Sequence, residues 1–198
     1  MKSLRRVILY AAIAFLWTVL PAHAELRSGI VAADVVLGQQ DITQVLTNSG
    51  GVNAASLNGP RAIFSDGKKL FVTDFSNHRV LIWNSIPEKN FTPADIVLGQ
   101  PDFVSNTFNN GGRSAKTLHF PGGIFSDGVK LFVVDRDNNR VLIWNTIPTA
   151  NFTPADIVLG QPNFTSGTLN NGGRTASTLN QPFSVFSDRK KLFVIDSN

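Results

Sequence analysis

Short apolar runs alternate with polar, glycine-rich stretches along most of the chain. Within one stretch, four such runs are rich in the β-branched and aromatic residues that favour strands, and turn residues separate them. These runs are residues 63–65, 70–73, 80–83 and 95–99. Beyond residue 24 no segment keeps a 3.6-residue period, and Gly or Pro interrupts every window of helical length. The pattern predicts an all-β protein made of short strands.

The pattern recurs at a fixed step of 61 residues. Segment 33–39 returns at 94–100 and again at 155–161 with the sequence Ala-Asp-(Val/Ile)-Val-Leu-Gly-Gln. Complete four-strand sets are expected at 62–99 and 123–160. A lone fourth strand at 34–38 precedes them, and a partial set at 184–198 follows. The chain is therefore expected to contain two whole units and parts of two others.

Four-strand units at a fixed period are typical of a β-propeller, because each small sheet buries its two apolar faces by stacking on its neighbours. We expect residues 25–198 to form an incomplete propeller with four-stranded antiparallel blades. A propeller closes with about four to eight blades. The chain is accordingly expected to be a fragment, with the ring closed by further blades or, alternatively, by other protomers.

One stretch of each unit resembles the NHL repeat, which is named for Asn-His-Leu. In the first unit the residues that carry the resemblance are Pro60, Ile63, Asp66, Gly67, Leu70, Phe71, Val72, Asp74, Asn77, His78, Arg79 and Val80. The second unit has Asn138-Asn139-Arg140 at the corresponding place. The resemblance implies a β-propeller. The NHL family that the chain resembles includes protein-binding and sensor modules and also some enzymes. NHL repeats are usually shorter, and the excess here lies around 94–118.

The N-terminus has the order of a secretory signal peptide. A basic start with Lys2, Arg5 and Arg6 precedes an apolar run at 7–20, and Ala22-His23-Ala24 fits a signal-peptidase site. We expect residues 1–24 to be removed by cleavage after Ala24. A retained membrane anchor is the less favoured alternative, because the run is shorter than the roughly 20 residues of a membrane span. The mature protein is expected to be secreted or periplasmic, with no attachment to the membrane.

Removal of the signal peptide changes the charge of the chain. The whole sequence carries a formal net charge of +4, whereas the part after residue 24 has 15 basic and 14 acidic residues, which gives +1. Nucleic-acid binding needs clustered, excess positive charge, so no nucleic-acid partner is expected. The chain has no cysteine. An exported protein without disulfides is more typical of bacteria than of animals.

Three polar residues recur in both complete units, and we interpret them as structural. Asp and Asn side chains can bind the backbone amides of a turn, and Arg can pair with the Asp. These residues are Asp74, Asn77, Arg79, Asp135, Asn138 and Arg140. Ligand binding is expected instead where the copies differ, at the end of the blades that carries the long linkers. The candidates there are Arg61, Phe75, His78, Arg113, Arg136, Asp137 and Arg174.

Catalytic and metal-binding patterns are weak. His78 and His119 are the two histidines beyond residue 24, they lie in different units, and no Gly-x-Ser-x-Gly motif is present. No catalytic residue, metal ligand or cofactor is therefore assigned. The leading hypothesis is an exported, non-catalytic scaffold that binds a protein, peptide or glycan. The alternative is a fragment of a propeller enzyme, a metal-dependent lyase or lactonase, with its catalytic residues in missing blades.

Overall fold

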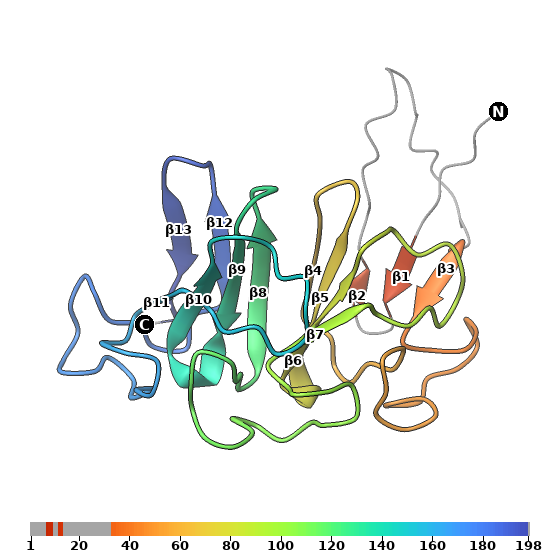
Figure 1. Ribbon diagram of the computed structural model, residues 1–198, viewed down its shortest axis with the longest axis horizontal. Helices are drawn as coiled ribbons and strands as arrows, with labels where there is room; N and C mark the ends of the chain where they lie inside the picture. Colours follow the sequence, from red (N-terminus) through yellow and green to blue (C-terminus); the bar gives the residue numbers. More distant parts are fainter. Residues whose placement is uncertain (1–6, 10–11, 14–32, 198) are drawn as a thin grey trace.

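The computed structural model describes residues 7–9, 12–13 and 33–197, and these residues form strands, turns and loops (Figure 1). The predicted all-β class is confirmed. The first complete unit is one antiparallel sheet in the order β4-β5-β6-β7. Its strands are β4 (Ala62–Ser65), β5 (Leu70–Asp74), β6 (Arg79–Trp83) and β7 (Ile96–Leu98).

The second unit repeats this sheet with the order β8-β9-β10-β11. Its strands are β8 (Pro121–Ser126), β9 (Leu131–Asp135), β10 (Arg140–Trp144) and β11 (Ile157–Leu159). The set predicted to begin at residue 123 begins two residues earlier, because Pro121 already pairs with Asp135 before a bulge. Short 3-10 turns, η1 (Phe75–Asn77) and η2 (Arg136–Asn138), connect the second and third strands of the two sheets.

The partial units are also strands. β12 (Ser184–Ser187) pairs with β13 (Leu192–Ile195). The predicted lone strand is β3 (Val35–Leu37), which joins β1 (Val7–Leu9) and β2 (Ala12–Ile13) in a small sheet. Apart from β1 and β2, the predicted signal peptide and its cleavage point after Ala24 lie outside the described residues. Within the described ranges no helix has the length and apolarity that a membrane crossing requires.

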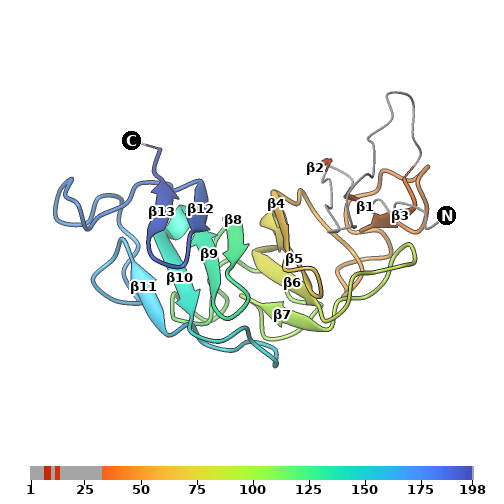
Figure 2. The same ribbon diagram turned by 90° about the horizontal axis from the view of Figure 1, so that it is seen from above.

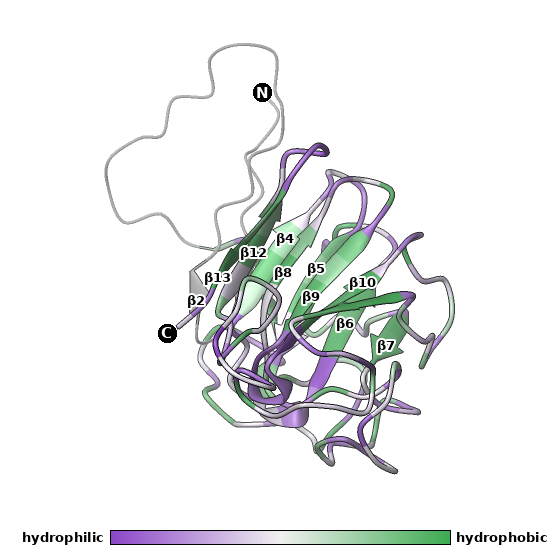
Figure 3. Cartoon of the chain, turned by 90° about the vertical axis from the view of Figure 1, so that its left-hand side faces the viewer, coloured by the Kyte–Doolittle hydropathy of each residue, from purple (hydrophilic) through white to green (hydrophobic). Residues whose placement is uncertain are grey.

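The sheets lie side by side, with β4, β8 and β12 as neighbours along one side and β7 and β11 on the opposite side (Figure 2). Apolar side chains fill the space between the sheets. In Figure 3 the strands are mostly hydrophobic, whereas the turns and loops are mixed, with many hydrophilic residues. A row of rings runs across the first strands: Phe64 and Phe125 have centroids 4.9 Å apart, and so do Phe125 and Phe186. Apolar faces that meet between neighbouring sheets are thus buried, whereas Ile157 in β11 and Phe186, Phe193 and Ile195 in β12 and β13 stay exposed.

The long linkers are folded onto one end of the sheets, which we call the linker end. It comprises the linkers 39–60, 100–120 and 161–181 together with the turns 74–78 and 135–139. A glycine with positive φ directly precedes each linker, and the linker returns beside this glycine, as in the bridge between Gly99 and Thr117. The side chain of Gln100 then binds the carbonyls of Thr107 and His78. The extra length of the repeat is therefore ordered structure.

Candidate binding site at the linker end

The repeated polar residues form a buried network, and the pairing expected from the sequence is present. Nε of Arg79 donates to Oδ2 of Asp74 at 2.8 Å, and Asn77 donates to the same oxygen at 2.8 Å. The other oxygen, Oδ1, accepts the backbone N–H of Asn58 at 2.7 Å. In the second unit Arg140, Asn138 and Asp135 repeat this arrangement. A buried charge is tolerable only with such complete pairing.

The Arg79 guanidinium also connects two successive linkers. Its Nη2 donates to the carbonyls of Asn53 and Ser56, in the linker before the sheet. Its Nη1 donates to the carbonyl of Phe103, in the linker after it, at 2.6 Å. Arg140 binds the carbonyls of Ser114, Thr117 and Phe164 in the same manner. The repeated arginines therefore hold the linker end together, and each of their three guanidinium nitrogens donates to the protein itself.

His78, a sequence candidate for ligand contact, is engaged within the protein. It adopts a left-handed backbone at φ 55°, and its Nδ1 accepts the backbone N–H of Phe120 at 3.2 Å. Asn139 occupies the equivalent position at φ 54° and accepts the N–H of Gln181 at 2.8 Å. Both side chains are buried. His78 and Asn139 therefore differ in residue type but make the same hydrogen bond to the linker that follows their sheet.

Burial lowers the pKa of His78 to about 4, and the neighbouring His119 acts in the same direction, while Asp137 opposes them. A protonated Nδ1 has no lone pair left for the N–H of Phe120. The neutral form is consequently the one that fits this site at neutral pH. His78 is thus better suited to a fixed structural acceptor than to a ligand contact.

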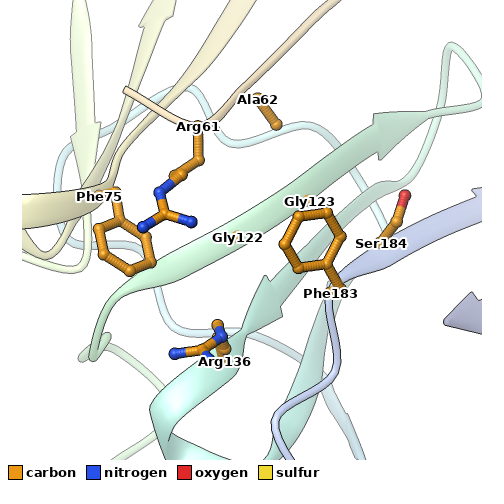
Figure 4. Close-up of a pocket in the computed structure, with 8 residues that line it drawn as sticks. All are labelled: Arg61, Ala62, Phe75, Gly122, Gly123, Arg136, Phe183 and Ser184. Atoms are coloured by element: carbon orange, nitrogen blue, oxygen red, sulfur yellow. The ribbon is translucent and has the colours of Figure 1, made fainter. Parts of the chain in front are cut away.

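A pocket of about 180 Å³ opens at the linker end between the first strands of three units (Figure 4). The residues that line it include Arg61, Phe75, Gly122, Arg136, Phe183 and Ser184. Three sequence candidates, Arg61, Phe75 and Arg136, are among them. Arg61, Gly122 and Phe183 are the same position in the three units. The pocket is therefore lined at the positions where the copies differ.

Gly122 adds no side chain to the lining of this pocket, whereas Arg61 and Phe183, at the same position in the other units, line it with large side chains (Figure 4). A Cβ at Gly122 would lie 3.2 Å from the carbonyl oxygen of Phe183. Gly123 has a different role, because a Cβ there would lie 2.8 Å from the Cα of Ser184. It allows β8 to approach β12 closely, with its N–H donating to the carbonyl of Phe183 at 3.0 Å.

The two arginines of the pocket are held differently. The Arg61 guanidinium lies 4.0 Å from the centre of the Phe75 ring, a cation–π contact that leaves its N–H groups exposed at the edge. Arg136 donates to Asp137 at 2.7 Å and to Gln181 at 3.0 Å. No Asp or Glu is among the lining residues. The pocket consequently presents excess positive charge over an aromatic surface.

Sequence reasoning missed a row of stacked rings that leads into the pocket. Phe108 stacks on His119 with centroids 4.7 Å apart, His119 on Phe120 at 5.0 Å, and Phe120 on Phe75 at 4.6 Å. None of the four positions has a ring of the same kind in the other complete unit or in the partial one. That these rings are not repeated was the signal available in the sequence. The stacking itself could not be predicted, because it joins residues from different units.

The remaining candidates lie away from the pocket. Nε of Arg113 donates to Oδ1 of Asn138 at 2.8 Å, and its Nη1 donates to the carbonyl of Thr165 at 3.3 Å. Arg174 is exposed in the next linker. Asp137 is in contact with Arg136 and is half-buried. In the described part of the chain, no three His, Cys, Asp or Glu side chains converge as metal ligands would.

No protein-family model matches the chain, and no curated protein matches it either.

Proposed function

We propose that the chain is an exported, non-catalytic scaffold of NHL-type propeller blades that binds a protein, peptide or glycan in the pocket at the linker end. The observation that carries this proposal is the convergence of unrepeated side chains, Arg61, Phe75, Arg136 and Phe183, on one pocket. Pockets with an apolar lining and a few polar groups are the usual form of a ligand site. The repeated polar residues contribute to the fold instead.

The propeller part of the proposal is supported by how the sheets pack. Two four-stranded antiparallel sheets lie side by side, and their first strands neighbour one another together with β12. In a propeller the first strands line the central channel, and the pocket lies at their ends. Export is supported by the signal-like order of residues 1–24.

The experiment compares the full chain with the variant Gly122→Phe on an array of peptides and glycans. Phenylalanine is the residue of the third unit at this position, Phe183, and Gly122 is not one of the glycines with positive φ. Its Cβ would lie 3.2 Å from the carbonyl oxygen of Phe183, so this strand must shift by a few tenths of an ångström for the ring to enter the pocket. We expect the wild type to bind a subset of the array and the variant to lose that binding while it stays folded, with an unfolding midpoint lowered by the close contact with Phe183. Identical binding patterns for the two proteins would contradict the proposal. Arg174→Gln is the matched surface control.

A further inference from the structure

We infer that the pocket recognises a carboxylate group of a peptide, with an adjacent apolar side chain placed against Phe183. The inference rests on the proposed function, because it names the chemistry of the ligand for the same pocket.

The charge of the pocket is positive. Arg61 and Arg136 both line it, and among the described residues the carboxylate that contacts either of them is that of Asp137, which pairs with Arg136 at 2.7 Å. Within the described ranges, the Arg61 guanidinium has no carboxylate partner. Asp137 therefore offsets one of the two positive charges, and the other is left for a ligand. An anion entering the pocket would meet a net attractive field.

The free donors have the geometry that a carboxylate requires. A guanidinium presents five N–H groups in a planar fork that matches the two oxygens of a carboxylate. The Phe75 ring lies beneath the Arg61 guanidinium at 4.0 Å and restrains its plane, so less side-chain freedom is lost on binding. Arg136 uses two of its N–H groups for Asp137 and Gln181. The rest of its fork has no protein partner among the residues that the structure describes.

The lining favours a peptide over a sugar. Besides the two arginines, Ser184 is the polar side chain among the lining residues, whereas Phe75 and Phe183 supply apolar surface. Phe183 is 54% exposed, which leaves its ring available for contact. A sugar has several hydroxyl groups that lose water on burial, and each needs a partner. One carboxylate beside an apolar side chain needs fewer hydrogen-bond partners. It also matches the two kinds of surface in the pocket, the arginines and the phenylalanine rings.

The carboxylate can belong to an acidic side chain or to a peptide C-terminus, and the test distinguishes these sources. The full 198-residue chain is titrated with acetyl-Glu-Leu-amide, acetyl-Ala-Leu with a free C-terminus, neutral acetyl-Gln-Leu-amide, and glucuronate, and binding is followed by NMR chemical shifts. We expect at least one of the two acids to bind, and the neutral peptide to bind about tenfold more weakly than that acid, since a hydrogen bond to a charged group contributes this much. The better of the two acids identifies the source.

We expect Arg61→Gln and Arg136→Gln each to weaken binding of that acid by about tenfold. The control Arg174→Gln removes the same charge from an exposed site outside the pocket and is expected to leave binding unchanged. Equal binding of the neutral and acidic peptides, tighter binding of glucuronate, an equal effect of Arg174→Gln, or no binding of any peptide would each overturn the inference. The proposed function fails separately, if filling the pocket with Gly122→Phe leaves the array pattern unchanged. If Gly122→Phe loses the array binding but the wild type shows no preference for carboxylates, the proposed function stands and only the proposed ligand class is wrong.

Discussion

Nε of Arg79 lies 2.8 Å from Oδ2 of Asp74, and neither side chain is exposed to solvent. The pair recurs as Arg140 and Asp135 at 2.7 Å, again fully buried. In both units the arginine also binds carbonyl groups of the linkers on either side of its own sheet. The long linkers are consequently fixed to the sheets through a charged residue that no solvent reaches.

Removal of this arginine is expected to destabilise the fold strongly. Arg79→Gln leaves the Asp74 carboxylate buried without its counter-charge and deprives linker carbonyls of their donors. We expect the free energy of unfolding to fall by about 3–5 kcal/mol, as it does when one partner of a buried ion pair is removed. Urea unfolding measures this loss. The control Arg174→Gln, at an exposed site, is expected to change stability by less than about 0.5 kcal/mol. A loss below about 1 kcal/mol for Arg79→Gln would contradict the structural role of the pair.

His78 makes stability depend on pH between its two pKa values. Its pKa is about 4 in the folded protein, against 6.5 for an unperturbed histidine, so the unfolded chain binds more protons in this interval. The contribution of His78 is therefore complete above pH 6.5 and declines as the pH falls toward 4. We expect a loss of roughly 2 kcal/mol, which is less than the full shift implies, because solvent screens part of the charge.

The matched variant for this effect is His78→Asn, which introduces the residue that the second unit carries at position 139. Asparagine keeps an acceptor for the N–H of Phe120 but does not titrate, as in the bond from Gln181 to Asn139. Unfolding midpoints measured from pH 4 to pH 8 are expected to fall less steeply for the variant than for the wild type. Parallel profiles for the two proteins would show that His78 does not cause the dependence.

A substitution at Gly99 tests the close packing of the backbone directly before each linker. Its φ is 90°, and a Cβ there would lie 2.7 Å from both the carbonyl oxygen of His78 and Cδ1 of Leu118. Gly67 has a φ of 89° but no atom within 4 Å of the same Cβ position. Gly67→Ala is expected to cost about 1–2 kcal/mol from backbone strain alone. Gly99→Ala is expected to cost a further 1–3 kcal/mol from overpacking. Thermal unfolding of both variants measures the difference between their losses of stability. Equal losses would show that the linker moves to accommodate the added methyl group at little cost.

The strand order and the buried ion pairs could be predicted from the sequence because both repeat. A strand such as β6 recurs as β10 after 61 residues with the same apolar residues, and the spacing of Asp74 and Arg79 recurs at Asp135 and Arg140. Repetition identifies residues that every unit needs, and those needs are mainly structural. The sequence pattern therefore indicated the scaffold in some detail.

The pocket was predicted only in part, because it forms between units. The differences at Arg61, Gly122 and Phe183 were visible in the sequence, and so were those at Phe75 and Arg136. Their convergence depends on how the first strands of neighbouring sheets pack, which no single unit encodes. His78 differs from Asn139 in the same way, yet both accept an equivalent backbone N–H. A difference between copies was thus a necessary sign of the site but not a sufficient one.

The central claim is that repeated side chains maintain the fold while unrepeated ones bind the ligand. Arg136 and Arg140 are four residues apart and allow a direct test, since Arg136 lines the pocket and Arg140 lies in the buried network. The measurement is the unfolding free energy of Arg136→Gln and Arg140→Gln, together with their affinity for whichever acidic dipeptide binds the wild type. We predict that Arg136→Gln keeps its stability within about 0.5 kcal/mol and loses about tenfold in affinity, whereas Arg140→Gln loses about 3–5 kcal/mol of stability. A stable Arg140→Gln, or an Arg136→Gln that binds as the wild type does, would contradict the account.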